Sequence, residues 1–195
     1  FTQRPLHGCG VLLTRASDQL SEWAEPLRQA GAEVFTPSVI EILPPGDWSS
    51  VDSAIDALRT GRVSGITFSS ANGVKGFFER LHARQFDSRL LAGTTIAAVG
   101  PATADQLFPH GLRADVMPTR SQTFSAAGLL DALPLSLADQ RWIVTSTNRS
   151  ADTLAQGIRQ RSAEVLPALC YETQRAKQLA PEIASALQAG RIHVA

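Results

Sequence analysis

The sequence lacks the residue patterns that most metal and nucleotide sites require. Its two cysteines form no CxxC or Cys/His spacing, and its four histidines show no HxH or HExxH motif. No GxGxxG, GxxxxGKS/T or GxSxG motif is present, so neither a nucleotide-binding loop nor a serine-hydrolase elbow is indicated. We therefore expect a protein that works without a metal and without a cofactor.

The chain also lacks a charge excess and a long apolar run. Its 18 basic residues balance its 18 acidic ones, which argues against a nucleic-acid partner. No apolar segment approaches the roughly 20 residues that span a bilayer, and residues 1–8 lack the apolar core of a signal peptide. Two thiols, Cys9 and Cys170, fit a reduced protein, and we expect a cytoplasmic one that contacts no membrane.

Strand and helix patterns alternate along most of the 195 residues. Apolar runs predict strands at 10–15, 32–37, 64–68, 95–99, 114–117, 141–146 and 163–168. Helical spacing predicts one helix from Ser17 or Asp18 to Gly31 and further helices at 48–58, 71–82, 101–108, 123–133, 150–160 and 179–189. Such alternation is typical of the α/β class with doubly wound parallel sheets.

Two extended segments interrupt this alternation and predict a two-domain organisation. Segments 39–45 and 169–173 would form a two-stranded linker with the properties of a hinge. Domain 1 would comprise residues 1–38 plus 174–195, and domain 2, residues 46–168, would be inserted in it. The chain begins at Phe1 rather than Met and ends in what looks like a new strand at 191–195, so we expect the natural protein to continue and the C-terminal part of domain 1 to be missing.

Two similar strand-to-helix turns lie about thirty residues apart, at 66–74 and 96–104. Further hydroxyl-rich turns follow at 119–124 and 145–148. Parallel strands end at one edge of the sheet, where ligands bind, and small side chains there leave helix N-terminal amides open to an anion. The pattern predicts a site that binds an acidic molecule through loops. The alternative is that these serines and threonines only cap helices.

Tyr171 is the only tyrosine, and it falls in the second extended segment. A phenol in a connector can donate a proton or hold a leaving hydroxyl. The alternative is a packed connector residue whose hydroxyl is satisfied by the protein. His82 and His110 fall near helix ends, where surface or capping roles are common.

Several segments, taken in order, resemble the uroporphyrinogen-III synthase family. They are residues 11–15, 31–34, 40–44, 67–74, 98–104, 126–130 and 171–173, and they extend over nearly the whole chain. The resemblance implies two α/β domains joined by a two-stranded linker, with hydroxymethylbilane, a linear tetrapyrrole with eight carboxylates, between them. It implies a cofactor-free lyase that removes a hydroxyl, inverts ring D through a spiro intermediate and closes the macrocycle. We also expect a monomer that receives its substrate in transient hand-over from hydroxymethylbilane synthase.

The resemblance also implies the site residues. Thr103 and Tyr171 match a threonine and a tyrosine implicated in the family's activity, and the tyrosine would assist loss of the hydroxyl. The expected substrate-binding residues are Thr14, Arg15, Ser69, Ser70, Ala71, Asn72, Gly100, Pro101, Ala102, Gln122, Thr123, Phe124, Ser146 and Thr147. The sequence departs from the family at 145–149, where a Gly/Arg-containing segment is common, and in the repeats expected after Ala195, which would supply one wall of the cleft.

Two other functions fit the same pattern. A two-domain small-molecule binding protein of the periplasmic type would have a similar hinge and cleft. A degenerate synthase-like domain with a regulatory role would keep the fold without the activity.

Overall fold

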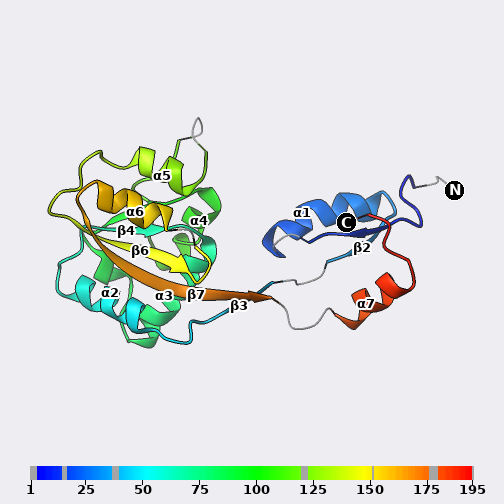
Figure 1. Ribbon diagram of the computed structural model, residues 1–195, viewed down its shortest axis with the longest axis horizontal. Helices are drawn as coiled ribbons and strands as arrows, with labels where there is room; N and C mark the ends of the chain where they lie inside the picture. The colour runs from blue at the N-terminus through cyan, green and yellow to red at the C-terminus, as the bar shows by residue number, and fades with distance from the viewer. Residues whose placement is uncertain are drawn as a thin grey trace. The chain divides into compact units, whose positions relative to one another are not determined.

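The computed structural model describes residues 4–14, 17–36, 40–119, 123–150, 152–175 and 180–194, with the backbone alone at 17–22. The chain divides into two compact units, Phe1–Ile42 with Thr173–Ala195, and Leu43–Glu172. Figure 1 labels most of their helices and strands. No helix within the described ranges is both long and apolar enough to cross a bilayer.

The first unit contains the predicted β-α-β arrangement. Strands β1 (Gly10–Leu12) and β2 (Glu33–Phe35) pair in parallel, and helix α1 (Ser17–Gln29) connects them. Gly31 takes a φ of 98° after the helix, a conformation that glycine adopts without steric cost. Helix α7 (Pro181–Gln188) leads to Val194, which forms a single parallel bridge with Val11. The predicted terminal stub therefore lies beside β1.

A five-stranded sheet has the order β3-β7-β6-β4-β5, and strands β4, β5 and β6 lie wholly in the second unit. Its strands are β3 (Ile40–Leu43), β4 (Gly65–Phe68), β5 (Thr95–Ala98), β6 (Arg141–Thr147) and β7 (Glu164–Arg175). The β4–β5, β4–β6 and β6–β7 pairs are all parallel. The predicted α/β class with parallel sheets is thus confirmed.

Helices cover both faces of this sheet (Figure 1). Helices α2 (Ser49–Arg59) and α3 (Ala71–Ala83) share one apolar cluster with Ile143, whereas α5 (Ala126–Ala132) and α6 (Thr153–Gln160) share another with Trp142 and Val144. Alternate β6 residues thus face opposite layers, as the two-residue period of a strand requires.

The region between β5 and β6 differs from the sequence prediction. The predicted helix 101–108 ends early, as α4 (Pro101–Asp105), and a separate 3-10 turn, η2, covers Phe108–His110. A further 3-10 turn, η1 (Ser88–Leu91), precedes β5.

The prediction of a strand at 114–117 is wrong, because a single bridge between Ala97 and Val116 replaces it. The Asp115 carboxylate accepts the Ile96 amide at 2.8 Å, which removes that donor from strand pairing, and Pro118 has no amide to donate. The predicted helix 123–133 begins only at Ala126, because the Ser125 side chain caps it.

Strand β7 is longer than the sequence indicates. The predicted strand 163–168 and the predicted connector 169–173 are one continuous strand of 12 residues, and the other connector contains β3. The β6–β7 register extends to a pair between Thr147 and Tyr171, with a shift after Ser146. Pairing with β6 therefore holds Tyr171, which lies in the predicted extended segment 169–173, within the sheet.

Candidate functional site

A cavity of about 500 Å³ opens within the second unit at the carboxyl edge of its sheet. Strands β4, β5 and β6 end beside it, which is where ligands bind in open parallel sheets. It is lined by Ser69, Ser70, Val99, Phe124, Ser125, Ala126, Val144, Thr145, Ser146, Thr147, Ser150, Asp152, Thr153, Leu154, Ala155 and Tyr171.

Ser70 and Tyr171 form a hydrogen bond on one wall of this cavity. Their hydroxyl oxygens are 3.1 Å apart, and either group can be the donor. The Ser70 oxygen also accepts the Gly73 amide at 3.1 Å, as the N-cap of the 13-residue helix α3. Tyr171 is therefore linked through one hydroxyl to the positive end of a helix dipole.

A shift in strand register sets the position of Tyr171. Ser146 pairs with Leu169, but Thr147 pairs with Tyr171, so Cys170 has no partner of its own on β6. Such bulges bend a strand and change where its side chains point. The phenol packs against the apolar cluster of α2 and α3, which brings it to the first turn of α3.

Several hydroxyls of the cavity bond to strand carbonyls. Ser69 donates to Thr145 O at 3.4 Å, Thr145 donates to Thr67 O at 2.9 Å, and Ser146 donates to Ala168 O at 3.5 Å. Thr145 is buried, with 2% of its surface exposed. These hydroxyls hold neighbouring strands together at the cavity floor, and Ser69 and Ser146 remain only partly buried.

The opposite wall comes from α5 and α6. The Ser125 oxygen accepts the Gly128 amide at 3.2 Å and so caps α5. Asp152, which precedes α6, pairs with Arg159 at 3.1 Å. Among the described residues that line the cavity there is no Lys, Arg or His, and the one charged side chain is Asp152, whose charge Arg159 balances. An anionic ligand would therefore meet mainly hydroxyls and helix N-terminal amides there.

The structure brings six of the predicted site residues together in this cavity. They are Ser69, Ser70, Phe124, Ser146, Thr147 and Tyr171. Phe124 is 48% exposed, and its side chain lies so close to Gly100 that a Cβ there would be 3.2 Å from the Phe124 Cβ.

The other predicted residues lie elsewhere. Ala71, Asn72, Gly100, Pro101, Ala102, Thr103 and Thr123 belong to the same unit but do not line the cavity, and Thr14 belongs to the first unit. Thr103 is buried in α4, and its amide donates to Gly100 O at 3.1 Å. Arg15 and Gln122 fall outside the described residues.

Five polar residues of the lining are missing from the expected site residues: Ser125, Thr145, Ser150, Asp152 and Thr153. Ser125 and Asp152 immediately precede helices, and serine and aspartate are typical N-cap residues, so the sequence could have indicated helix starts there. The predicted start of one helix at residue 123 and of the other at residue 150 obscured that signal.

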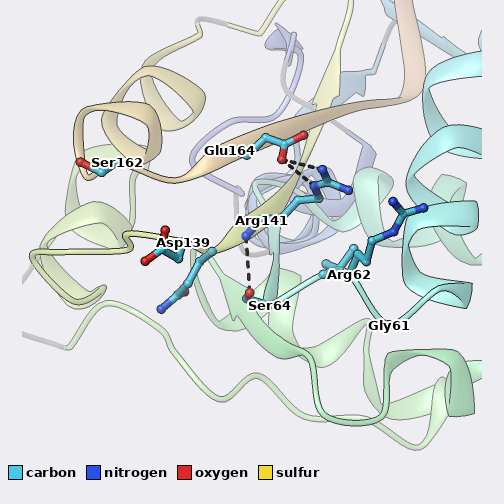
Figure 2. A pocket seen from close by; sticks show the side chains of 9 residues that line it. Gly61, Arg62, Ser64, Asp139, Arg141, Ser162 and Glu164 are labelled. Atoms are coloured by element: carbon cyan, nitrogen blue, oxygen red, sulfur yellow. Dashed lines mark hydrogen bonds and ion pairs between the residues drawn. The ribbon is translucent and has the colours of Figure 1, made fainter.

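A second cavity, of about 520 Å³, opens at the amino edge of the same sheet (Figure 2). Its lining residues precede β4, β6 and β7 and include Arg62, Ser64 and Asp139. Figure 2 shows Arg141 turned toward Glu164, with 2.6 Å between their closest atoms. Because Glu164 balances the charge of Arg141 and ligands of such sheets bind at the carboxyl edge, we take the first cavity as the candidate site.

Two observations concern the metal-binding and thiol side chains of the described part of the chain. It holds no group of three or more His, Cys, Asp or Glu side chains that could bind a metal ion. Burial raises the pKa of the Cys170 thiol to about 12, so this buried thiol is protonated at neutral pH.

Comparison with known proteins gives a consistent result. The family model described as uroporphyrinogen-III synthase HemD matches residues 21–195. The chain is 31% identical over 195 residues to a uroporphyrinogen-III synthase from Synechococcus elongatus, covering 100% of this chain and 72% of that protein. It is 26% identical over 181 residues to one from Chlorobaculum parvum, covering 88% of this chain and 70% of the relative.

The fold has a counterpart among solved structures. A mutant uroporphyrinogen III synthase from the extremely thermophilic bacterium Thermus thermophilus superposes with a TM-score of 0.63 at 19% identity, covering 94% of this chain and 70% of that chain. At this identity the match supports the mixed α/β fold with parallel sheets.

Proposed function

We propose, from the premise that this chain belongs to the uroporphyrinogen-III synthase family, that it catalyses the lyase reaction for which that family is named. In that reaction hydroxymethylbilane loses water and closes to uroporphyrinogen III, with inversion of ring D. The observation that carries the proposal is the match of the family model over residues 21–195. The cavity supports it, because the Tyr171 hydroxyl lines the cavity and is hydrogen-bonded to the Ser70 hydroxyl.

The chemistry of this reaction suits a site with few charged groups. The C–O bond of the hydroxymethyl group breaks as the pyrrole nitrogen releases electrons into the ring system. The enzyme then has to fix which carbon of ring D attacks, which is a matter of orientation more than of strong acid–base catalysis. A cavity of hydroxyls, apolar side chains, one phenol and one carboxylate that is paired with Arg159 meets that requirement.

Carboxylate recognition is proposed for the hydroxyl-rich turns. The substrate carries eight carboxylates, and the N-termini of α3 and α6 border the cavity with their dipoles oriented to favour anions. Ser69, Ser146 and Thr147 would bind carboxylate oxygens there through their side chains, and Ser70 would border the substrate as the N-cap of α3. The predicted contacts of Thr14, Arg15, Ala71, Asn72, Gly100, Pro101, Ala102, Gln122, Thr123 and Phe124 remain part of this proposal.

Tyr171 is proposed as the group that protonates the leaving hydroxyl. Its phenol lines the cavity and already bonds to another hydroxyl, so it lies within a polar wall of the site. Thr103 is proposed to act by positioning, because it is buried in the turn that carries Gly100 and makes no part of the cavity lining.

The wider organisation is proposed with the function. Domain 1 would comprise 1–38 and 174–195, domain 2 would comprise 46–168, and segments 39–45 and 169–173 would link them. A monomer of this kind would accept hydroxymethylbilane from hydroxymethylbilane synthase by transient hand-over.

The test of the site is the Tyr171→Phe variant under steady-state conditions. General acid catalysis contributes on the order of 10²-fold or more, so we expect kcat to fall by about that factor while KM changes little. Arg62→Ala, at the amino-edge cavity, is the control and should keep both parameters. Equal kcat for Tyr171→Phe and the parent would remove Tyr171 from the mechanism.

A further inference from the structure

Ser70 occupies a position between the only tyrosine of the chain and the backbone of a helix. Its oxygen accepts the Gly73 amide at 3.1 Å and is 3.1 Å from the Tyr171 oxygen. A hydroxyl has one proton and two acceptor lone pairs. With the amide occupying one lone pair, the Ser70 proton is still available for the phenolic oxygen.

This geometry has a chemical consequence for a phenol that gives up its proton. A phenolate oxygen needs donors, and hydrogen bonds to charged groups are stronger than those between neutral ones. Ser70 can donate to that oxygen while the Gly73 amide and the α3 dipole polarise the serine hydroxyl. The cap of α3 is therefore also placed to stabilise ionised Tyr171.

We propose that Ser70 is a positioning residue for Tyr171: it orients the phenolic proton toward the substrate and donates its own proton to the phenolate. This inference rests on the proposed function. In the step, the Tyr171 O–H bond breaks and its proton joins the leaving hydroxyl to form water, while the C–O electron pair stays on that oxygen. The phenolate regains a proton when the ring carbon that forms the new bond loses its own.

Among the described residues of the cavity, two other serines, Ser125 and Ser69, have no such hydrogen bond to the phenol. Ser125 caps α5 in the same manner, through the Gly128 amide at 3.2 Å, and lines the same cavity. The hydrogen bond of Ser69 goes to Thr145 O instead. Ser70 is thus the serine of this cavity with a hydrogen bond to the phenol, and Ser125 is a matched control for loss of a cap.

The first measurement is spectroscopic, on the whole chain with tyrosine labelled by carbon-13 at Cζ. One tyrosine gives one resonance. Ser70→Ala should move this resonance, because it removes the hydroxyl bonded to the phenol, whereas Ser125→Ala should leave it in place. Both variants should lose similar stability, since each removes one N-cap. An unmoved resonance in Ser70→Ala would overturn the inference.

The second measurement is kinetic. Ser70→Ala should lower kcat on the order of tenfold with little change in KM, and Ser70→Thr, which keeps a hydroxyl, should restore most of it. In a Tyr171→Phe background Ser70→Ala should cost nothing further, because it acts through the phenol. An additive loss would contradict the proposal. Failure of the parent to form the type III isomer would instead refute the proposed function, and the resonance would still report on the Ser70 contact.

Discussion

Burial shifts the ionisation of two side chains in the second unit, Cys170 and His110. Burial raises the pKa of the Cys170 thiol to about 12, because a thiolate would be poorly solvated beside the α2–α3 apolar cluster. Burial also lowers the pKa of His110, and the nearby His82 adds to the effect. The His110 ring stacks on Phe78 with 3.8 Å between ring centroids.

Cys170 should react with thiol reagents only after unfolding. The thiolate is the reactive form, and the buried thiol is both protonated and covered. In a Cys9→Ser background, labelling of Cys170 should follow the global unfolding transition in denaturant. Rapid labelling under native conditions would contradict the buried position.

His110 should make the protein less stable in mild acid. Its pKa is lowered in the folded state, so the unfolded state binds the proton first as pH falls. The stability contribution is complete above about pH 6.5 and is lost as pH falls from there through the folded pKa. The unfolding free energy of the parent relative to His110→Gln should therefore decrease between about pH 8 and about pH 5. A pH-independent difference between parent and variant would contradict this.

At the scale of elements, helix α3 lies unusually close to strand β7. A Cβ built at Gly76 would overlap the carbonyl oxygen of Cys170, so only glycine allows this approach. The same helix buries Phe77 and Phe78 and places its N-cap beside Tyr171. Packing at Gly76 and the Ser70–Tyr171 bond therefore depend on the same contact between α3 and β7.

Gly76→Ala should destabilise the protein despite alanine's higher helix propensity. The gain of roughly 1 kcal/mol from propensity is smaller than the cost of overpacking against a backbone carbonyl, and we expect a net loss of about 2 kcal/mol. Lys75→Ala, on the exposed side of the same helix, is the control. Denaturant unfolding measures both, and a Gly76→Ala variant as stable as the parent would refute the close packing.

The elements themselves were largely predictable from the sequence. Buried strands such as 64–68 read as short apolar runs, and helix 71–82 follows its hydrophobic period. The convergence of hydroxyl-rich turns followed from parallel strand order alone. The predictions of element bounds failed where helix caps or local side-chain hydrogen bonds intervene. At the predicted strand 114–117, for example, the Asp115 carboxylate accepts the Ile96 amide that strand pairing would use.

The contacts of the site were less predictable than its location. The hydrogen bond between Ser70 and Tyr171 joins residues 101 positions apart and depends on the register shift after Ser146. Hydrophobic periodicity carries no signal for such a shift. Likewise, the sequence gives no sign that Thr103 is buried in α4 and does not line the cavity.

At the scale of the whole molecule, the two units differ in their cores. Both large apolar clusters lie entirely within Leu43–Glu172. In the first unit the buried apolar side chains of the described residues are few: Val11, Ala24, Ala32, Ile183 and Ala186. Burial of apolar surface dominates stability, so the units should differ in resistance to unfolding.

Amide hydrogen exchange should therefore separate the two units. We expect amides of β1 and β2 to exchange through openings of lower free energy than amides of β4 and β6. Equal protection in both units would show that they unfold as one cooperative body and would contradict this account.

The most direct test of the central claim, that this chain closes and inverts the tetrapyrrole, is an isomer assay. Hydroxymethylbilane is supplied by a coupled synthase, the products are oxidised, and the porphyrin isomers are separated by chromatography. We predict that type III dominates with the parent chain and that Tyr171→Phe shifts the products toward type I, the isomer of spontaneous closure. Type I alone from the parent chain would contradict the claim.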